Sequence, residues 1–216
     1  MAPYFETIKI SFADVDTDPG VNTLQFLDAC DDLVRLFDIL GPAFSMVQSD
    51  LNGNITKVRA VAKECGTLQG LVEKKQEEKT AAEKTATEGL MWLFRALSFT
   101  CEALQIVQKE KEKTDKDRKE LSAAFTESYK LKLKPFHNFV VQGFFSAAMI
   151  ACPSRGPFYA QLAVADPATW KDVTAGQLET LNVELDKWLE ALASIIGRMK
   201  AVYGEDPKNK KKPLIY

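Results

Sequence analysis

Apolar side chains recur every three or four residues along most of this chain of 216 residues. That spacing places them on one face of an α-helix. Only ETIKISFADV (6–15) alternates in the manner of a strand. Glycine and proline residues interrupt the helical pattern, as expected where one helix ends and the next begins. The pattern therefore predicts an all-α protein with helices near 23–39, 43–64, 67–78, 80–109, 116–134, 136–151, 156–163 and 174–203.

The predicted helix 80–109 is apolar on nearly every side. Leu90, Phe94 and Leu97 follow one stripe along it, and Trp92 and Phe99 follow another. A helix with this pattern is typical of the centre of a bundle. Arg95 is one charge in a nine-residue apolar run of this helix, and it needs a partner or a route to water.

The chain contains no internal repeat and no Ser- or Gly-rich linker. The charged segment 108–120 is polar all round and is interpreted as a helix end followed by an exposed connection. We therefore expect a single domain over 1–216, with an N-terminal extension at 1–21 and a basic C-terminal tail at 204–216.

Composition and charge narrow the class of protein. The chain is 46% hydrophobic and 27% charged, which suits a soluble globule, and its formal net charge is −2. This charge gives no general attraction to nucleic acid or to acidic membranes. The N-terminal residues lack the basic and apolar regions of a signal peptide, and the longest uncharged apolar stretch, 139–152, is shorter than the roughly 20 residues that span a bilayer. These features predict a cytoplasmic protein.

The residues that catalysis and metal binding require are scarce. Cys30, Cys65, Cys101 and Cys152 form no CxxC pair, and the chain has one histidine, so we expect reduced thiols, no metal and no cofactor. The sequence contains no GxSxG elbow, no Gly-rich phosphate loop and no HExxH. These absences argue against an enzyme.

A row of polar residues marks the predicted helix 43–64. Asp50, Asn54 and Lys57 stand at positions i, i+4 and i+7 and so share one helix face, with Gly53 among them. The row can be a solvated face with an Asp–Lys pair, or it can bind a ligand rich in hydroxyl groups. Gly53 favours the second interpretation slightly, because a missing side chain allows a close approach and glycine inside a helix costs about 1 kcal/mol. Each member of the row borders the apolar stripe formed by Val47, Leu51, Ile55, Val58 and Ala62.

Trp92 and His137 each allow two interpretations. Trp92 can be part of the core, or its ring can stack on the face of a sugar. His137 precedes an apolar surface and can be a core residue, or its imidazole N–H can bind a ligand carbonyl. The residues that share its predicted helix face are Val141, Phe144, Phe145 and Ala148.

Three segments together resemble the glycolipid transfer protein family. They are SDLNGNITKVRAVA (49–62), LMWLFRAL (90–97) and PFHNFVVQGFFSAAMIACP (135–153), and they occur in the order of the family and at about its separations. The acidic pI of about 5.6 and Phe139 resemble the fungal heterokaryon-incompatibility branch of the family. The resemblance implies a two-layer, all-α sandwich of about eight helices that encloses a hydrophobic lipid pocket. It also implies a non-enzymatic protein that transfers glycosphingolipids between membranes.

The resemblance also implies a role for each site residue. Trp92 would stack on the first sugar, and Asp50, Asn54 and Lys57 would hydrogen-bond its hydroxyls. Asp50 would accept from the ceramide amide N–H, and His137 would donate to the amide carbonyl. Members of the family that carry ceramide-1-phosphate have an arginine at the position of Trp92, so the tryptophan favours a sugar head group. The lipid chains would contact Phe44, Val47, Leu131, Val141, Phe145 and Ala148.

Membrane contact and ligand choice follow from the same resemblance. Phe139 stands where mammalian members carry a tryptophan that meets the membrane, and Val140 accompanies it. The implied ligands are glucosylceramide, galactosylceramide or lactosylceramide, carried by a monomer that touches membranes transiently and binds no nucleic acid. Two alternatives remain open: a glycolipid sensor or signalling adaptor on the same fold, and a structural helical module with a filled core.

Overall fold

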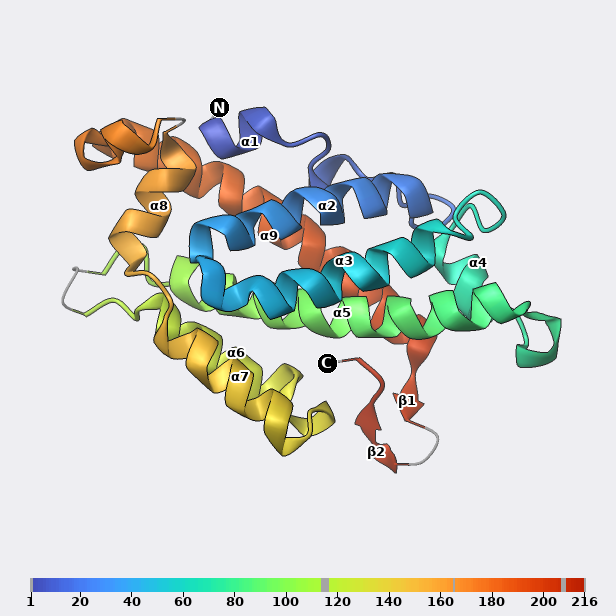
Figure 1. Cartoon of the computed structure of the whole chain (residues 1–216). Coiled ribbons are helices and arrows are strands. Elements are labelled where there is room, and N and C mark those ends of the chain that lie inside the picture. The colour runs from blue at the N-terminus through green and yellow to red at the C-terminus, as the bar shows by residue number, and fades with distance from the viewer. Residues whose placement is uncertain (1, 114–116, 165, 207–208, 216) are drawn as a thin grey trace.

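A computed structural model of the chain describes residues 2–113, 117–164, 166–206 and 209–215 (Figure 1). Helices make up nearly all of its regular structure, which confirms the predicted all-α class. The α-helices are α1 (Pro3–Thr7), α2 (Thr23–Leu40), α3 (Ser45–Arg59), α4 (Leu68–Glu73), α5 (Ala81–Gln108), α6 (Leu121–Lys132), α7 (Phe139–Ile150), α8 (Arg155–Ala163) and α9 (Ala175–Tyr203). Short 3₁₀ helices are η1 (Phe12–Asp14), η2 (Pro42–Phe44), η3 (Gln76–Glu78), η4 (Lys134–Phe136) and η5 (Pro167–Asp172).

Helix α5 lies at the centre of the molecule. It packs against α3, α6 and α9, while α2 covers α3 and α7 packs on α6 (Figure 1). Thr80 and Glu83 form a capping box that fixes the start of α5, and Thr174 and Gln177 do the same for α9. The two longest helices therefore begin at defined residues, and α5 presents one side to α3 and another to α6.

One hydrophobic core joins the whole described chain. Phe26 of α2 stacks on Phe94 of α5 with ring centroids 5.2 Å apart. Trp188 of α9 is buried against Phe5 and Phe12. The N-terminal residues predicted to be an extension thus contribute side chains to the core.

Helix α5 is long and apolar enough, by length and composition, to cross a membrane, alone among the described helices. In this fold 72% of its most apolar window is buried inside the protein. Its apolar character is accounted for by its central position, as the sequence pattern indicates.

Several predicted boundaries differ from the structure. The helix predicted over 43–64 is α3 preceded by η2 and followed by turns, and the one predicted over 67–78 is divided into α4 and η3. The helix predicted over 116–134 begins at Leu121, and residue 116 lies outside the described residues. The helix predicted over 136–151 begins only at Phe139, because the Asn138 side chain accepts a hydrogen bond from the Val141 N–H and caps it.

The alternating segment 6–15 forms no strand. Its backbone N–H groups at Lys9 and Ile10 donate to the Asp32 carboxylate of α2, at 2.6 and 3.3 Å. A buried side chain thus satisfies backbone groups that would otherwise need a neighbouring strand.

The predicted C-terminal tail returns to the body of the protein. Strands β1 (Glu205–Asp206) and β2 (Asn209–Pro213) pair antiparallel. Beyond them the Leu214 carbonyl accepts a hydrogen bond from Arg95 Nε at 2.8 Å, and Ile215 is fully buried. Residues 207, 208 and 216 of this tail lie outside the described residues.

Candidate functional site

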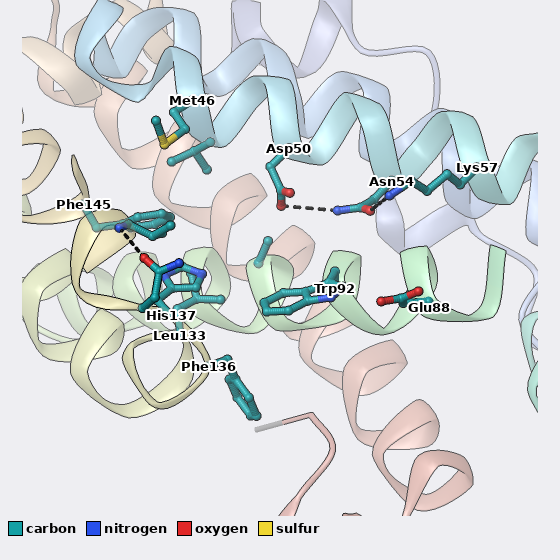
Figure 2. Close-up of a pocket in the computed structure, with 14 residues that line it drawn as sticks. Met46, Asp50, Asn54, Lys57, Glu88, Trp92, Leu133, Phe136, His137 and Phe145 are labelled. Carbon is teal, nitrogen blue, oxygen red and sulfur yellow. Dashed lines mark hydrogen bonds between the residues drawn. The ribbon is translucent and has the colours of Figure 1, made fainter. Parts of the chain in front are cut away.

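A cavity of about 480 Å³ opens between α3, α5 and the segment from η4 into α7 (Figure 2). The five polar or aromatic residues singled out in the sequence all contribute to its lining, although they come from three separate segments. Figure 2 shows the row from α3 facing Trp92 of α5, with the histidine at one end. These residues are Asp50, Asn54, Lys57, Trp92 and His137.

The polar row of α3 is connected by hydrogen bonds. Asn54 Nδ2 donates to Asp50 Oδ2 and Lys57 Nζ donates to Asn54 Oδ1, both at 3.2 Å. The Asn54 side chain is buried, with 3% of its surface exposed, whereas Lys57 is exposed. Burial raises the pKa of Asp50 above its usual value, although Lys57 and Asn54 partly oppose this. The Asp50 carboxylate therefore lacks sufficient compensation for its lost hydration and is suited to accept hydrogen bonds from a ligand.

The glycine that allows a close approach in this site is not the one expected. A Cβ at Gly53 would meet nothing within 4 Å, so no surface packs closely there. A Cβ at Gly89 of α5 would lie 3.1 Å from Lys57 Cδ and 3.2 Å from Lys57 Cβ. The small residue at 89 therefore brings α5 and the end of the polar row together.

Trp92 is half-buried in the wall of the cavity. Its ring is nearly parallel to that of His137, with an interplanar angle of 18° and centroids 6.1 Å apart. The Arg95 guanidinium lies over both the Trp92 ring, at 4.5 Å, and the Phe136 ring, at 3.7 Å. Arg95, the charge within the apolar helix, is thus held by two aromatic rings and the Leu214 carbonyl.

His137 precedes α7 in extended conformation, so it is not part of the helix face predicted for it. Its Nδ1 lies 3.2 Å from the Tyr129 hydroxyl, and its backbone carbonyl accepts a hydrogen bond from Gln142 at 2.8 Å. Burial lowers the pKa of His137, with a smaller contribution from the positive charge of Arg95. The ring is therefore neutral near pH 7, with one N–H to donate.

The apolar residues assigned to the lipid chains lie in three different environments. Val47, Val141 and Phe145 line the cavity. Phe44 and Ala148 are buried outside this lining, and the Phe44 ring contacts those of Phe37 and Phe125.

Leu131 lies outside the cavity, because 53% of its surface is exposed. It is two residues beyond Tyr129 on α6, which places it about 200° around the helix from that inward-facing residue. Leu133, just beyond the end of α6, lines the cavity and is 2% exposed.

Several residues of the site were not predicted from the sequence. Met46, Glu88, Phe136 and Asn138 also line the cavity, and Tyr129 contacts His137 from α6. Of these residues, only Met46 lies on α3, four positions before Asp50, so the position of the polar row could have indicated it. The others come from segments whose position depends on tertiary packing.

The site is suited to binding rather than bond-making chemistry. Within the described residues no group of three or more His, Cys, Asp or Glu side chains is placed to hold a metal ion, and the four cysteines are free. The site offers an acidic acceptor, an amide, a cation, a neutral imidazole and an aromatic face. This combination suits a ligand with hydroxyl and amide groups.

The outward face of α7 is apolar and exposed. Phe139 is 85% exposed and Ile150 is 84% exposed, while Val140 and Phe144 are each about half exposed. Phe139 is the first residue of α7, and His137 lies before this helix.

Comparisons with known proteins agree with this geometry. The profile of the glycolipid transfer protein (GLTP) family matches residues 21–164. A glycolipid transfer protein of Aureobasidium melanogenum is 39% identical over 199 residues, which cover 89% of each chain.

Two solved structures share the fold over almost their whole length. The fungal glycolipid transfer protein HET-C2 superposes with a TM-score of 0.72 at 39% identity and covers 92% of this chain and 95% of its own. The FAPP2 structure, described as selecting simple glycosphingolipids with the GLTP fold, has a TM-score of 0.77 at 31% identity and covers 93% and 94%.

The similarity to fungal members agrees with the resemblance seen in the sequence, and the two-layer helical architecture is confirmed. Proteins of this family transfer lipids and are not enzymes, which confirms the expectation of a non-enzymatic protein. By its sequence, its fold and its polar site, this chain belongs to the glycolipid transfer protein family.

Proposed function

We propose that this protein binds a glycosphingolipid and transfers it between membranes without vesicles. The convergence of Asp50, Asn54, Lys57, Trp92 and His137 around one cavity is the observation that carries the proposal. Their side chains come from separate segments, so a solvated helix face does not account for the arrangement. The family of the chain supports the same function.

In the proposed complex the first sugar stacks on the Trp92 ring. Its hydroxyls hydrogen-bond with Asp50, Asn54 and Lys57, which already form a connected row. Asp50 also accepts from the ceramide amide N–H. Tyr129 Oη lies 3.2 Å from His137 Nδ1. The proposed complex requires the tautomer in which Nδ1 accepts from the Tyr129 hydroxyl and Nε2 carries the proton for the amide carbonyl. A lipid without these groups leaves buried polar atoms unpaired, at a cost of about 1–3 kcal/mol each.

The lipid chains enter the apolar end of the cavity, past Val47, Val141 and Phe145. Each CH₂ buried there avoids a transfer cost of about 0.8 kcal/mol in water. The cavity of about 480 Å³ is of the size that encloses a small ligand, so two long chains require further space. We expect them to separate α7 from the core beside Phe145 and Ala148.

The proposed ligands, location and membrane contact follow from the geometry of this site and from the exposed residues of α7. Ligands with one or two sugars, such as glucosylceramide, galactosylceramide and lactosylceramide, suit the short polar row. The free cysteines support a cytoplasmic location, and the protein is proposed to act as a monomer. Transient membrane contact is assigned to Phe139 and Val140. A glycolipid sensor or signalling adaptor would use the same site but would release its ligand too slowly for bulk transport.

Two experiments test the proposal in sequence. Mass spectrometry of lipid extracted from the purified protein should detect a glycosphingolipid, whereas a structural module with a filled core would carry none. Fluorescent glycolipid should then move from donor to acceptor vesicles in the presence of the protein. Binding without transfer would favour the sensor, and the absence of both would contradict the proposal.

His137→Leu should weaken glycolipid binding by about 1–2 kcal/mol, because one hydrogen bond is lost and a lipid carbonyl remains unpaired. Titration with galactosylceramide measures this loss. Tyr129→Phe is the control, since it leaves the imidazole in place and should cost less. An unchanged affinity for His137→Leu would exclude the contact.

Phe139→Ala should slow transfer and reduce partitioning to vesicles while leaving lipid affinity unchanged. The exposed ring enters the membrane interface, and full burial of a Phe is worth about 1.5–3 kcal/mol, with less for partial insertion. Since the net charge is −2, added salt should change partitioning only slightly.

Val183→Ala is the matched control for this prediction, because Val183 is an exposed apolar residue of α9. Partitioning measured by vesicle sedimentation should not change in this variant. A steep fall in wild-type partitioning with salt would contradict docking through Phe139 and would indicate the lysines of 208–212.

A further inference from the structure

A second cavity, of about 730 Å³, lies at a different part of the molecule from the proposed glycolipid site. Its lining comes from the segment that follows α5, the first residues of α8, η5 and the first two turns of α9. No residue lines both cavities. The proposed transfer function therefore gives this second cavity no role.

The deepest charged group of this cavity is Arg155. Only 7% of its surface is exposed, and its Nη1 atom is buried with no hydrogen-bond partner. Its guanidinium lies 4.8 Å from the centre of the Tyr159 ring. Glu120, the carboxylate that contacts this residue, bonds to its backbone N–H at 2.8 Å. A buried guanidinium donor without an acceptor is unfavourable, and an anion would satisfy it.

The backbone around Arg155 also favours an anion. Arg155 is the first residue of α8, and Ala175, the first residue of α9, lines the same cavity. First-turn N–H groups lack carbonyl partners within their helix, and the helix dipole places positive charge there. The first N–H of α8 already donates to Glu120 and α9 has its capping box, so the helix starts add positive potential and the buried Arg155 guanidinium supplies the free donor.

The remaining charged side chains of the lining are either paired or exposed. Lys111 pairs with Asp186 at 2.6 Å, and Arg118 donates to the Lys111 carbonyl. Lys171 is exposed, and so are the acidic residues of the lining, Glu112, Glu120 and Glu179. Arg155 is therefore the one buried charge among the described lining residues, while the carboxylates of the lining and Lys171 are exposed.

We propose that this cavity binds a small molecule through its phosphate group, with Arg155 as the principal ligand of the phosphate. A guanidinium pairs with phosphate through charge-assisted hydrogen bonds, and helix N-termini add backbone donors. The exposed carboxylates of the lining select phosphates that also carry hydroxyl or amino donors. The half-buried Trp170 supplies an apolar surface for the organic part.

Titration of the whole protein with AMP, adenosine and inorganic phosphate tests this proposal at constant ionic strength. AMP should bind at millimolar concentrations or below, change the tryptophan fluorescence of the protein through Trp170 and raise the melting temperature. Adenosine, which lacks the phosphate, should bind at least roughly tenfold more weakly. If inorganic phosphate binds as tightly as AMP, the protein recognises only the phosphate group. If AMP binds more tightly, the organic part also contributes to binding.

Arg155→Met keeps the length of the side chain and removes its charge. It should weaken AMP and phosphate binding roughly tenfold or more without slowing glycolipid transfer. Arg198→Met, a change at an exposed cation of α9, is the matched control and should bind as wild type does. Equal binding by Arg155→Met and wild type would overturn the proposal. So would the absence of AMP and phosphate binding to wild type, a result that depends on no variant.

Discussion

Asp50→Val is expected to abolish glycolipid transfer while the helical fold persists. Asp50 borders the buried stripe of α3 and is proposed to contact both the sugar and the ceramide amide. Its replacement leaves Asn54 without an acceptor and the ligand without its principal one, a loss of several contacts worth about 1–3 kcal/mol each. Vesicle-to-vesicle transfer of a fluorescent glycolipid measures the loss, and circular dichroism checks the fold. Transfer at the wild-type rate would remove Asp50 from the site.

Asp50→Asn removes the negative charge of this side chain and keeps nearly the same shape. Because burial raises the pKa of Asp50, the folded state disfavours its ionised form, and the contribution of Asp50 to stability is lost as pH rises through that raised pKa. The neutral amide should therefore increase the melting temperature at neutral pH while transfer decreases. This advantage over wild type should shrink as the pH falls below the pKa of Asp50. A variant less stable than wild type at neutral pH would show that the carboxylate stabilises the fold.

Trp92→Ala should have the second largest effect and weaken glycolipid binding roughly tenfold or more, since the burial of an aromatic ring contributes about 1.5–3 kcal/mol. The sugar loses its stacking surface, and Arg95 loses one of its two rings. Binding titrations measure the loss, with thermal unfolding as the test of structural damage.

Trp92→Phe is the matched control for this prediction, because it keeps a smaller ring at the same place. It should retain an intermediate affinity. If Trp92→Ala bound the glycolipid as tightly as wild type, the stacking role would be excluded.

The helices could be predicted because burial of one face imposes a period of 3.6 residues on the sequence. The predicted limits of α5 and α9 lie close to the observed ones, since both helices are long and begin at capping residues. The row formed by Asp50, Asn54 and Lys57 was also visible, because all three belong to one helix. Residues on one helix have a relative geometry that sequence spacing alone determines.

Tertiary contacts determine the rest of the site, and local patterns do not encode them. Gly89 is unremarkable in sequence, yet its missing side chain allows Lys57 to approach. His137 was predicted inside a helix that begins at 136 because its neighbours are periodic, but Asn138 caps the helix and its first residue is Phe139. Leu131 and Leu133 are both leucines near the end of α6, and only the packing shows which one faces the cavity.

The hydrogen bond between Arg95 and Leu214 spans 119 residues of sequence. During synthesis on the ribosome, the polar row, Trp92 and His137 all emerge long before Leu214 does. A nascent chain can therefore fold the walls of the cavity while Arg95 still lacks its carbonyl acceptor. The Trp92 and Phe136 rings gain this support only once Leu214 has returned to Arg95. One wall of the head-group site therefore depends on a residue made long after the rest of that site.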